Sequence, residues 1–97
     1  MTNRQQDRHE LAAWGRYRTG TGTAYDVLLK DISEKGCRFA DRLGRLEEGQ
    51  ALTIRIGTIG PIEAVVMWTR DRVVGVQFRN ALYPSVMQHI IAQQNTR

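Results

Sequence analysis

Short runs in which apolar and polar residues alternate occupy most of the chain, and this pattern predicts β-strands with one buried face. In one run, Tyr25, Val27 and Leu29 alternate with positions that are mostly polar. The same pattern predicts strands at residues 11–18, 37–40, 51–56, 62–69 and 73–78. Glycine-rich segments at residues 20–22 and 57–60 indicate turns. Several short strands at this spacing predict a mainly β fold, either a small antiparallel barrel or a sandwich.

The pattern changes near the end of the chain, where apolar residues recur at helical spacing. These residues are Leu82, Val86, Met87, Ile90 and Ile91. Pro84 suits the first turn of a helix, where no backbone N–H is needed. We therefore predict a C-terminal α-helix over residues 81–93, which covers one opening of the sheet structure.

The start of the chain is polar, with no apolar residue among the first nine after Met1. We expect residues 1–9 to form a mobile arm and residues 10–79 to form the β structure, within a single domain of 97 residues. A chain of this length buries roughly 60–65% of the surface that its unfolded form exposes. That is sufficient for one small core.

Charge and cysteine content indicate the kind of partner and the cellular compartment to expect. The net charge of +4 favours anionic partners. The single cysteine, Cys37, excludes an intrachain disulfide and suits a reducing compartment. We expect its side chain to be small and buried rather than nucleophilic. The polar start is unlike a signal peptide, and no apolar run approaches the ~20 residues of a membrane span. We therefore expect a cytoplasmic protein without a membrane span.

Two short motifs carry the candidate chemistry. Arg4 and Arg8 form R-x-x-x-R, and Asp31, Ser33 and Gly36 form D-x-S-x-x-G. Taken alone, the first is compatible with a solvated basic arm. The second is compatible with a plain turn whose Asp and Ser side chains bond their own backbone. Together, in this order and with the strand pattern that follows, they resemble the signature of the PilZ domain, a bacterial receptor module for cyclic di-GMP.

The resemblance extends over residues 4–92 and implies a six-stranded antiparallel β-barrel of the split-barrel type with a C-terminal helix. It also implies that cyclic di-GMP is bound by Arg4, Arg8, Asp31, Ser33 and Gly36. Arginine forks onto phosphate oxygens, pairs with guanine and stacks on bases. A carboxylate accepts from the guanine N1–H and amine, and a serine two positions on in an extended stretch projects from the same face. A glycine allows positive φ and a close approach of the backbone to the ligand.

A tryptophan is the secondary candidate. Trp68 lies in residues 66–71, which together with residues 74–78 are similar to the family's final hairpin. The tryptophan of that hairpin often lies beside the ligand, and packing in the core is the alternative. Trp14 is expected to pack. Many relatives carry a further arginine directly before the first motif arginine, where this chain has Asn3, so the resemblance leaves open whether one or two ligand molecules bind.

The leading hypothesis is a receptor that orders its arginine arm on cyclic di-GMP and signals to an unidentified downstream protein. The second is a PilZ-fold adaptor that binds no nucleotide. The third is a nucleic-acid binder, which ranks last because aromatic residues form only 7% of the chain and most fall at expected core positions. The sequence contains no motif of a catalytic base, metal cluster or cofactor, so we expect no enzymatic activity, metal or cofactor.

Overall fold

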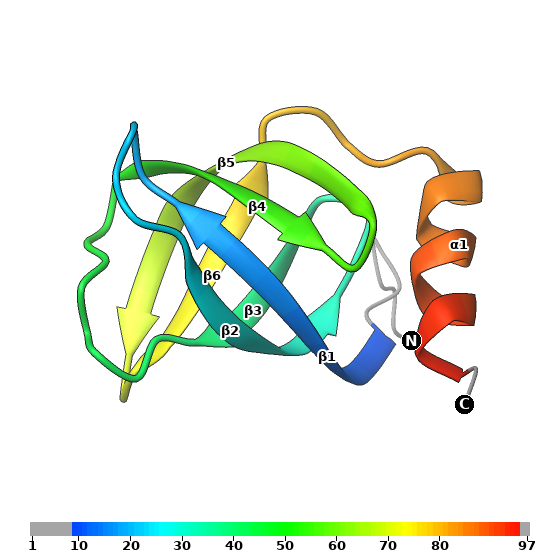
Figure 1. Cartoon of the computed structure of the whole chain (residues 1–97), viewed down its shortest axis with the longest axis horizontal. Coiled ribbons are helices and arrows are strands. Elements are labelled where there is room, and N and C mark those ends of the chain that lie inside the picture. Colours follow the sequence, from blue (N-terminus) through cyan, green and yellow to red (C-terminus); the bar gives the residue numbers. More distant parts are fainter. Residues whose placement is uncertain (1–8, 96–97) are drawn as a thin grey trace, which may run out of the picture.

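A computed structural model of the chain describes residues 9–95, in which six antiparallel strands close into a barrel and one helix covers its end (Figure 1). The elements are β1 (His9–Arg18), β2 (Tyr25–Ile32), β3 (Gly36–Ala40), β4 (Ala51–Ile56), β5 (Ile59–Arg70), β6 (Val73–Phe78) and α1 (Pro84–Asn95). The strand order around the barrel is β1-β2-β3-β6-β5-β4, and β4 pairs back onto β1. The prediction of a six-stranded antiparallel barrel with a C-terminal helix is confirmed, and the sandwich is excluded.

Several element boundaries differ from the sequence prediction, and the starts of β5 and α1 differ most, by three residues each. β5 begins at Ile59, which pairs with Ile56, so the β4–β5 turn is shorter than residues 57–60. The helix begins at Pro84 rather than at residue 81, because the Tyr83 carbonyl accepts the first helical hydrogen bonds. Pro84 is therefore the first helical residue, where its missing N–H costs nothing. The segment before Pro84 is bonded to the β2–β3 turn instead, since the Leu82 amide donates to the Glu34 carbonyl at 2.8 Å.

The core fills the inside of the barrel with the alternate side chains of every strand. Its fully buried members include Phe39 of β3 and Ile54 and Ile56 of β4. Met87 and Ile90 of α1 are buried against the same cluster. The helix therefore covers one opening of the barrel, as predicted, at the end where β1 begins (Figure 1).

Two single-residue expectations have opposite outcomes. Cys37 is buried in the core, as expected. The expectation that Trp14 packs is wrong, because its side chain is 64% exposed. Ala13 and Tyr17 point into the barrel, so the two-residue alternation of β1 places Trp14 on the outer face, opposite Leu28 of β2. Among the residues that the structure describes, no helix has the length and apolar character needed to cross a membrane.

Candidate functional site

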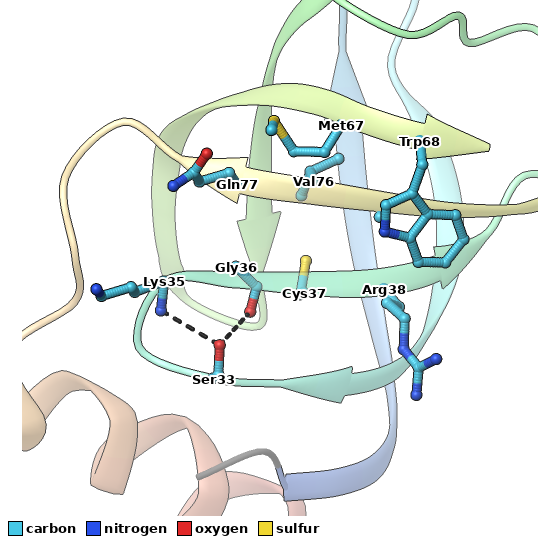
Figure 2. A pocket seen from close by; sticks show the side chains of 10 residues that line it. Ser33, Lys35, Gly36, Cys37, Arg38, Met67, Trp68, Val76 and Gln77 are labelled. Carbon is cyan, nitrogen blue, oxygen red and sulfur yellow. Dashed lines mark hydrogen bonds between the residues drawn. The ribbon is translucent and has the colours of Figure 1, made fainter. Parts of the chain in front are cut away.

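The D-x-S-x-x-G motif builds the connection between β2 and β3. The Ser33 amide donates to the Gly36 carbonyl at 2.8 Å, which closes a four-residue turn. The Ser33 hydroxyl is completely buried, donates to the same carbonyl at 3.4 Å and accepts from the Lys35 amide at 3.3 Å (Figure 2). The serine side chain therefore fixes the shape of the turn through bonds to its own backbone.

Gly36 is required by the neighbouring strand. A Cβ atom at this position would lie 2.1 Å from the Val76 carbonyl oxygen of β6, which no side chain tolerates. Gly36 is absent from the residues with positive φ, so the expectation of a left-handed backbone here is wrong. The close approach expected at this glycine exists, and the group approached is β6 of the protein itself.

Asp31 lies at the end of β2 and is paired with a residue outside both motifs. Its Oδ2 atom accepts from Nε of Arg38 at 2.8 Å and also contacts Nη2 of the same guanidinium. Asp31 is only 1% exposed, whereas the Arg38 side chain is 43% exposed. Arg38 is opposite Asp31 in the β2–β3 register. The buried carboxylate therefore has a partly exposed arginine as its partner.

Trp68 lies on the outer surface of the barrel rather than in the core, which excludes core packing as its role. It pairs with Gly75 across β5 and β6, and Gly75 pairs with Arg38 across β6 and β3. A Cβ atom on Gly75 would lie 2.3 Å from Cε2 and 2.4 Å from Nε1 of the indole. The glycine thus allows the indole to lie across β6 toward Arg38. The Arg70 guanidinium carbon lies 5.9 Å from the indole centroid, within cation–π range.

These side chains line one depression of about 400 Å³, which we call the Trp68 hollow (Figure 2). Its lining residues are Ser33, Lys35, Gly36, Cys37, Arg38, Met67, Trp68, Gly75, Val76 and Gln77. Among these described residues two are cationic, Lys35 and Arg38, and none is acidic. A cationic hollow with an indole wall suits an anionic ligand that carries flat rings.

The structure brings together some of the predicted site residues. Ser33, Gly36 and Trp68 line the Trp68 hollow, and Asp31 is joined to it through Arg38. Asp31 lies in β2, whereas Ser33 follows the end of this strand at Ile32, so the strand alternation on which their common direction was predicted does not extend to Ser33. That these four residues contact the ligand stays a prediction.

Arg4 and Arg8 lie outside the described residues. The strand that follows them begins beside the motif, since His9 pairs with Ile32 in the β1–β2 register. Sequence reasoning missed Lys35, Arg38, Met67 and Gln77. The sequence did contain a signal for Arg38. Asp31 comes two residues before Ser33 and Arg38 comes two residues after Gly36, so a hairpin turn at residues 33–36 places these opposite charges across from each other. In the described part of the chain, no cluster of His, Cys, Asp and Glu side chains is suited to a metal ion.

The arrangement around Gly75 can be tested by adding one methyl group. In Gly75→Ala the new Cβ overlaps the indole of Trp68, so we expect the ring to swing away from β6. Because a side chain moves rather than the backbone, the loss of stability should be about 1 kcal/mol. The measurement is tryptophan fluorescence in a Trp14→Phe background, in which Trp68 is the only tryptophan. An emission spectrum unchanged by Gly75→Ala would contradict the described position of the indole.

Comparison with known proteins gives both a family and similar structures. The PilZ domain matches residues 2–93. The structure of the Bacillus subtilis inhibitor of motility (MotI/DgrA) has a TM-score of 0.73 and 18% identity, and the match covers 100% of this chain and 54% of that one. The K. pneumonia MrkH complex with c-di-GMP has a TM-score of 0.61 and 19% identity, with 96% and 50% covered.

A second MrkH structure, described as a c-di-GMP-dependent transcription regulatory factor, has a TM-score of 0.61 and 19% identity, with 94% and 49% covered. This chain thus spans about half the length of these proteins, and at such identity they show a shared fold. No curated protein matches the sequence. Because the family match spans nearly the whole sequence and the fold agrees with it, this chain belongs to the PilZ domain family.

Proposed function

We propose that this protein is a cytoplasmic receptor for cyclic di-GMP that passes its signal to a downstream protein and catalyses no reaction. The observation that carries the proposal is the Trp68 hollow, where the D-x-S-x-x-G turn, two cations and an indole meet in a chain that also contains R-x-x-x-R. The chain is a PilZ domain, and the similar protein MrkH was solved as a complex with c-di-GMP.

The chemistry of the Trp68 hollow matches the ligand. Cyclic di-GMP carries two phosphates and two guanines on one closed ring. Lys35 and Arg38 supply positive charge for the phosphates, and the flat face of Trp68 can stack on a base. The turn around Ser33 offers polar backbone at the same place. Arg4 and Arg8 would add two further cations from the N-terminal side.

The proposed mechanism is a local switch. His9 pairs with Ile32, so the chain enters the barrel beside the D-x-S-x-x-G turn. Ligand phosphates and guanines draw Arg4 and Arg8 onto this surface, and the arm becomes ordered over the ligand. The ordered arm and the ligand then form a new surface for a downstream protein.

A second candidate function is a PilZ-fold adaptor that binds no nucleotide. One observation favours it: Ser33 and Gly36 each have a structural role without a ligand. Ser33 fixes the turn, and Gly36 leaves room for the Val76 carbonyl. The presence of these two residues alone therefore does not decide between receptor and adaptor.

The deciding experiment is isothermal titration calorimetry with cyclic di-GMP, with GTP and cyclic di-AMP as controls. We expect selective binding. In Arg8→Ala the loss of one charged, bidentate partner should cost about 1.5–3 kcal/mol, roughly a tenfold to hundredfold loss of affinity. The measured heats also give the number of ligand molecules bound.

The matched control is Arg55→Ala, which makes the same change of charge on β4, a strand that does not contribute to the Trp68 hollow. We expect Arg55→Ala to bind like the parent. Equal binding by Arg8→Ala and the parent would contradict the role of the arm. No heat from the folded parent, together with unshifted NMR amide signals, would support the adaptor instead.

A further inference from the structure

The two residues of the Asp31–Arg38 ion pair differ in exposure, since Asp31 is buried and Arg38 is partly exposed. The Asp31 carboxylate is buried, and its Oδ2 atom is contacted by both Nε and Nη2 of the Arg38 guanidinium. Asp31 is not among the residues that line the Trp68 hollow, whereas Arg38 is. A ligand seated in this hollow would therefore meet the guanidinium before it meets the carboxylate.

Arg38 is held in a position suited to recognition. It shares one row of the sheet with Gly75 and Trp68, so its guanidinium on β3 and the indole on β5 lie on either side of β6, at the same end of the hollow (Figure 2). The guanidinium is planar and always charged, and it both bonds phosphate or guanine oxygens and stacks on bases. Because Asp31 fixes the side chain in advance, less conformational entropy is lost when a ligand binds.

We propose that Arg38 contacts the ligand directly and that Asp31 is a positioning residue, which orients Arg38 instead of reading guanine itself. The proposal rests on the proposed function and changes the role that the sequence suggested for Asp31. The ligand class is a guanine nucleotide with phosphodiester groups, met by the guanidinium beside the Trp68 indole. The competing interpretation is that the pair only stabilises the β2–β3 hairpin.

The test is a double-mutant cycle measured by calorimetry with cyclic di-GMP. Arg38→Met keeps most of the apolar stem and removes the charge, and we expect it to bind about tenfold to hundredfold more weakly than the parent. Asp31→Asn should weaken binding in the parent. In the Arg38→Met background the same change should have no further effect, because Asp31 acts through Arg38.

Two further variants test whether binding needs only the positive charge of Arg38 or also its planar guanidinium, and whether any arginine–carboxylate pair on the surface has the same effect. Arg38→Lys keeps the charge without the planar fork, so it should bind more weakly than the parent and more tightly than Arg38→Met. Arg79→Met is the matched control. It breaks another arginine–carboxylate pair, with Glu63 at 3.0 Å, outside the Trp68 hollow, and it should leave affinity unchanged.

The outcomes distinguish this inference from the proposed function. If the parent binds and Arg38→Met binds equally well, Arg38 is no ligand contact. If Asp31→Asn costs the same affinity in both backgrounds, Asp31 contacts the ligand itself. Either result overturns the inference and leaves the receptor intact. If the folded parent does not bind, both proposals fall.

A folding defect in Arg38→Met would follow from removing the guanidinium that pairs with the buried Asp31 carboxylate. Two measurements do not depend on that variant. The double variant Asp31→Asn, Arg38→Met also removes the buried carboxylate charge and must still bind weakly. In the parent protein, the NMR signal of the Arg38 Nε–H must shift on addition of cyclic di-GMP, and an unmoved signal in a protein that binds would refute the contact.

Discussion

A Phe39→Ala variant is expected to lose about 3–5 kcal/mol of unfolding free energy, since it deletes a large, completely buried ring from the middle of a small core. The ring stacks on Tyr17 with their centroids 5.7 Å apart, and both belong to the single core cluster. Domains of this size are stable by about 5–15 kcal/mol, so the variant approaches the limit of folding. Urea denaturation followed by circular dichroism measures the loss.

Phe39→Leu is the control for the size of the cavity. Leucine fills part of the space, so we expect a smaller loss, roughly 1–2 kcal/mol. Phe39 points inward from β3 and its neighbour Arg38 points outward, so Phe39→Leu should keep the ligand affinity of the parent if β3 stays in place. A loss below about 1 kcal/mol in Phe39→Ala would contradict the packing described for this ring.

The strands were predictable because one face of each is buried and the other is exposed. In β4 the pattern of Ala51–Ile56 alternates cleanly, and the predicted bounds are those found. The start of α1 was less predictable. Leu82 fits the helical spacing, yet its amide bonds the Glu34 carbonyl, a contact across the fold that no local pattern reveals. The prediction that Trp14 packs was wrong for a different reason. The residue is apolar, but the alternation of β1 places its side chain on the outer face of the barrel.

Only those residues of the candidate site that lie close together in the sequence could be predicted. Asp31, Ser33 and Gly36 belong to one short motif and could be recognised together. The Trp68 hollow also needs β5 and β6, which reach β3 only through the order in which the barrel closes. Lys35 and Gln77 therefore had no sequence signal that joined them to the motif. Gly75 falls inside the strand predicted at residues 73–78, but the reason for a glycine there, the indole lying across it, required the strand register.

Gly36→Ala is expected to lower both stability and ligand affinity, and it separates two explanations of the motif glycine. The new Cβ would lie 2.1 Å from the Val76 carbonyl oxygen and 3.3 Å from Cα of Gln77. These are backbone atoms, so β3 and β6 must move apart, at a cost of about 2–3 kcal/mol. The displaced strands line the Trp68 hollow, so we expect affinity for cyclic di-GMP to fall about tenfold or more. Urea denaturation and calorimetry on the same samples measure both quantities.

Gly44→Ala provides the matched control, because no atom lies within 4 Å of its Cβ position and its φ of +63° makes left-handed backbone strain the only cost. That strain costs about 1–2 kcal/mol, and affinity should stay unchanged. If Gly36→Ala proves as stable as the parent, β3 and β6 do not approach as described. If it is as stable as the parent and still fails to bind, the glycine serves the approach of the ligand, as the sequence first suggested. A joint loss of stability and affinity, larger in stability than that of Gly44→Ala, assigns the glycine to the barrel and makes the ligand site depend on how closely these two strands pack.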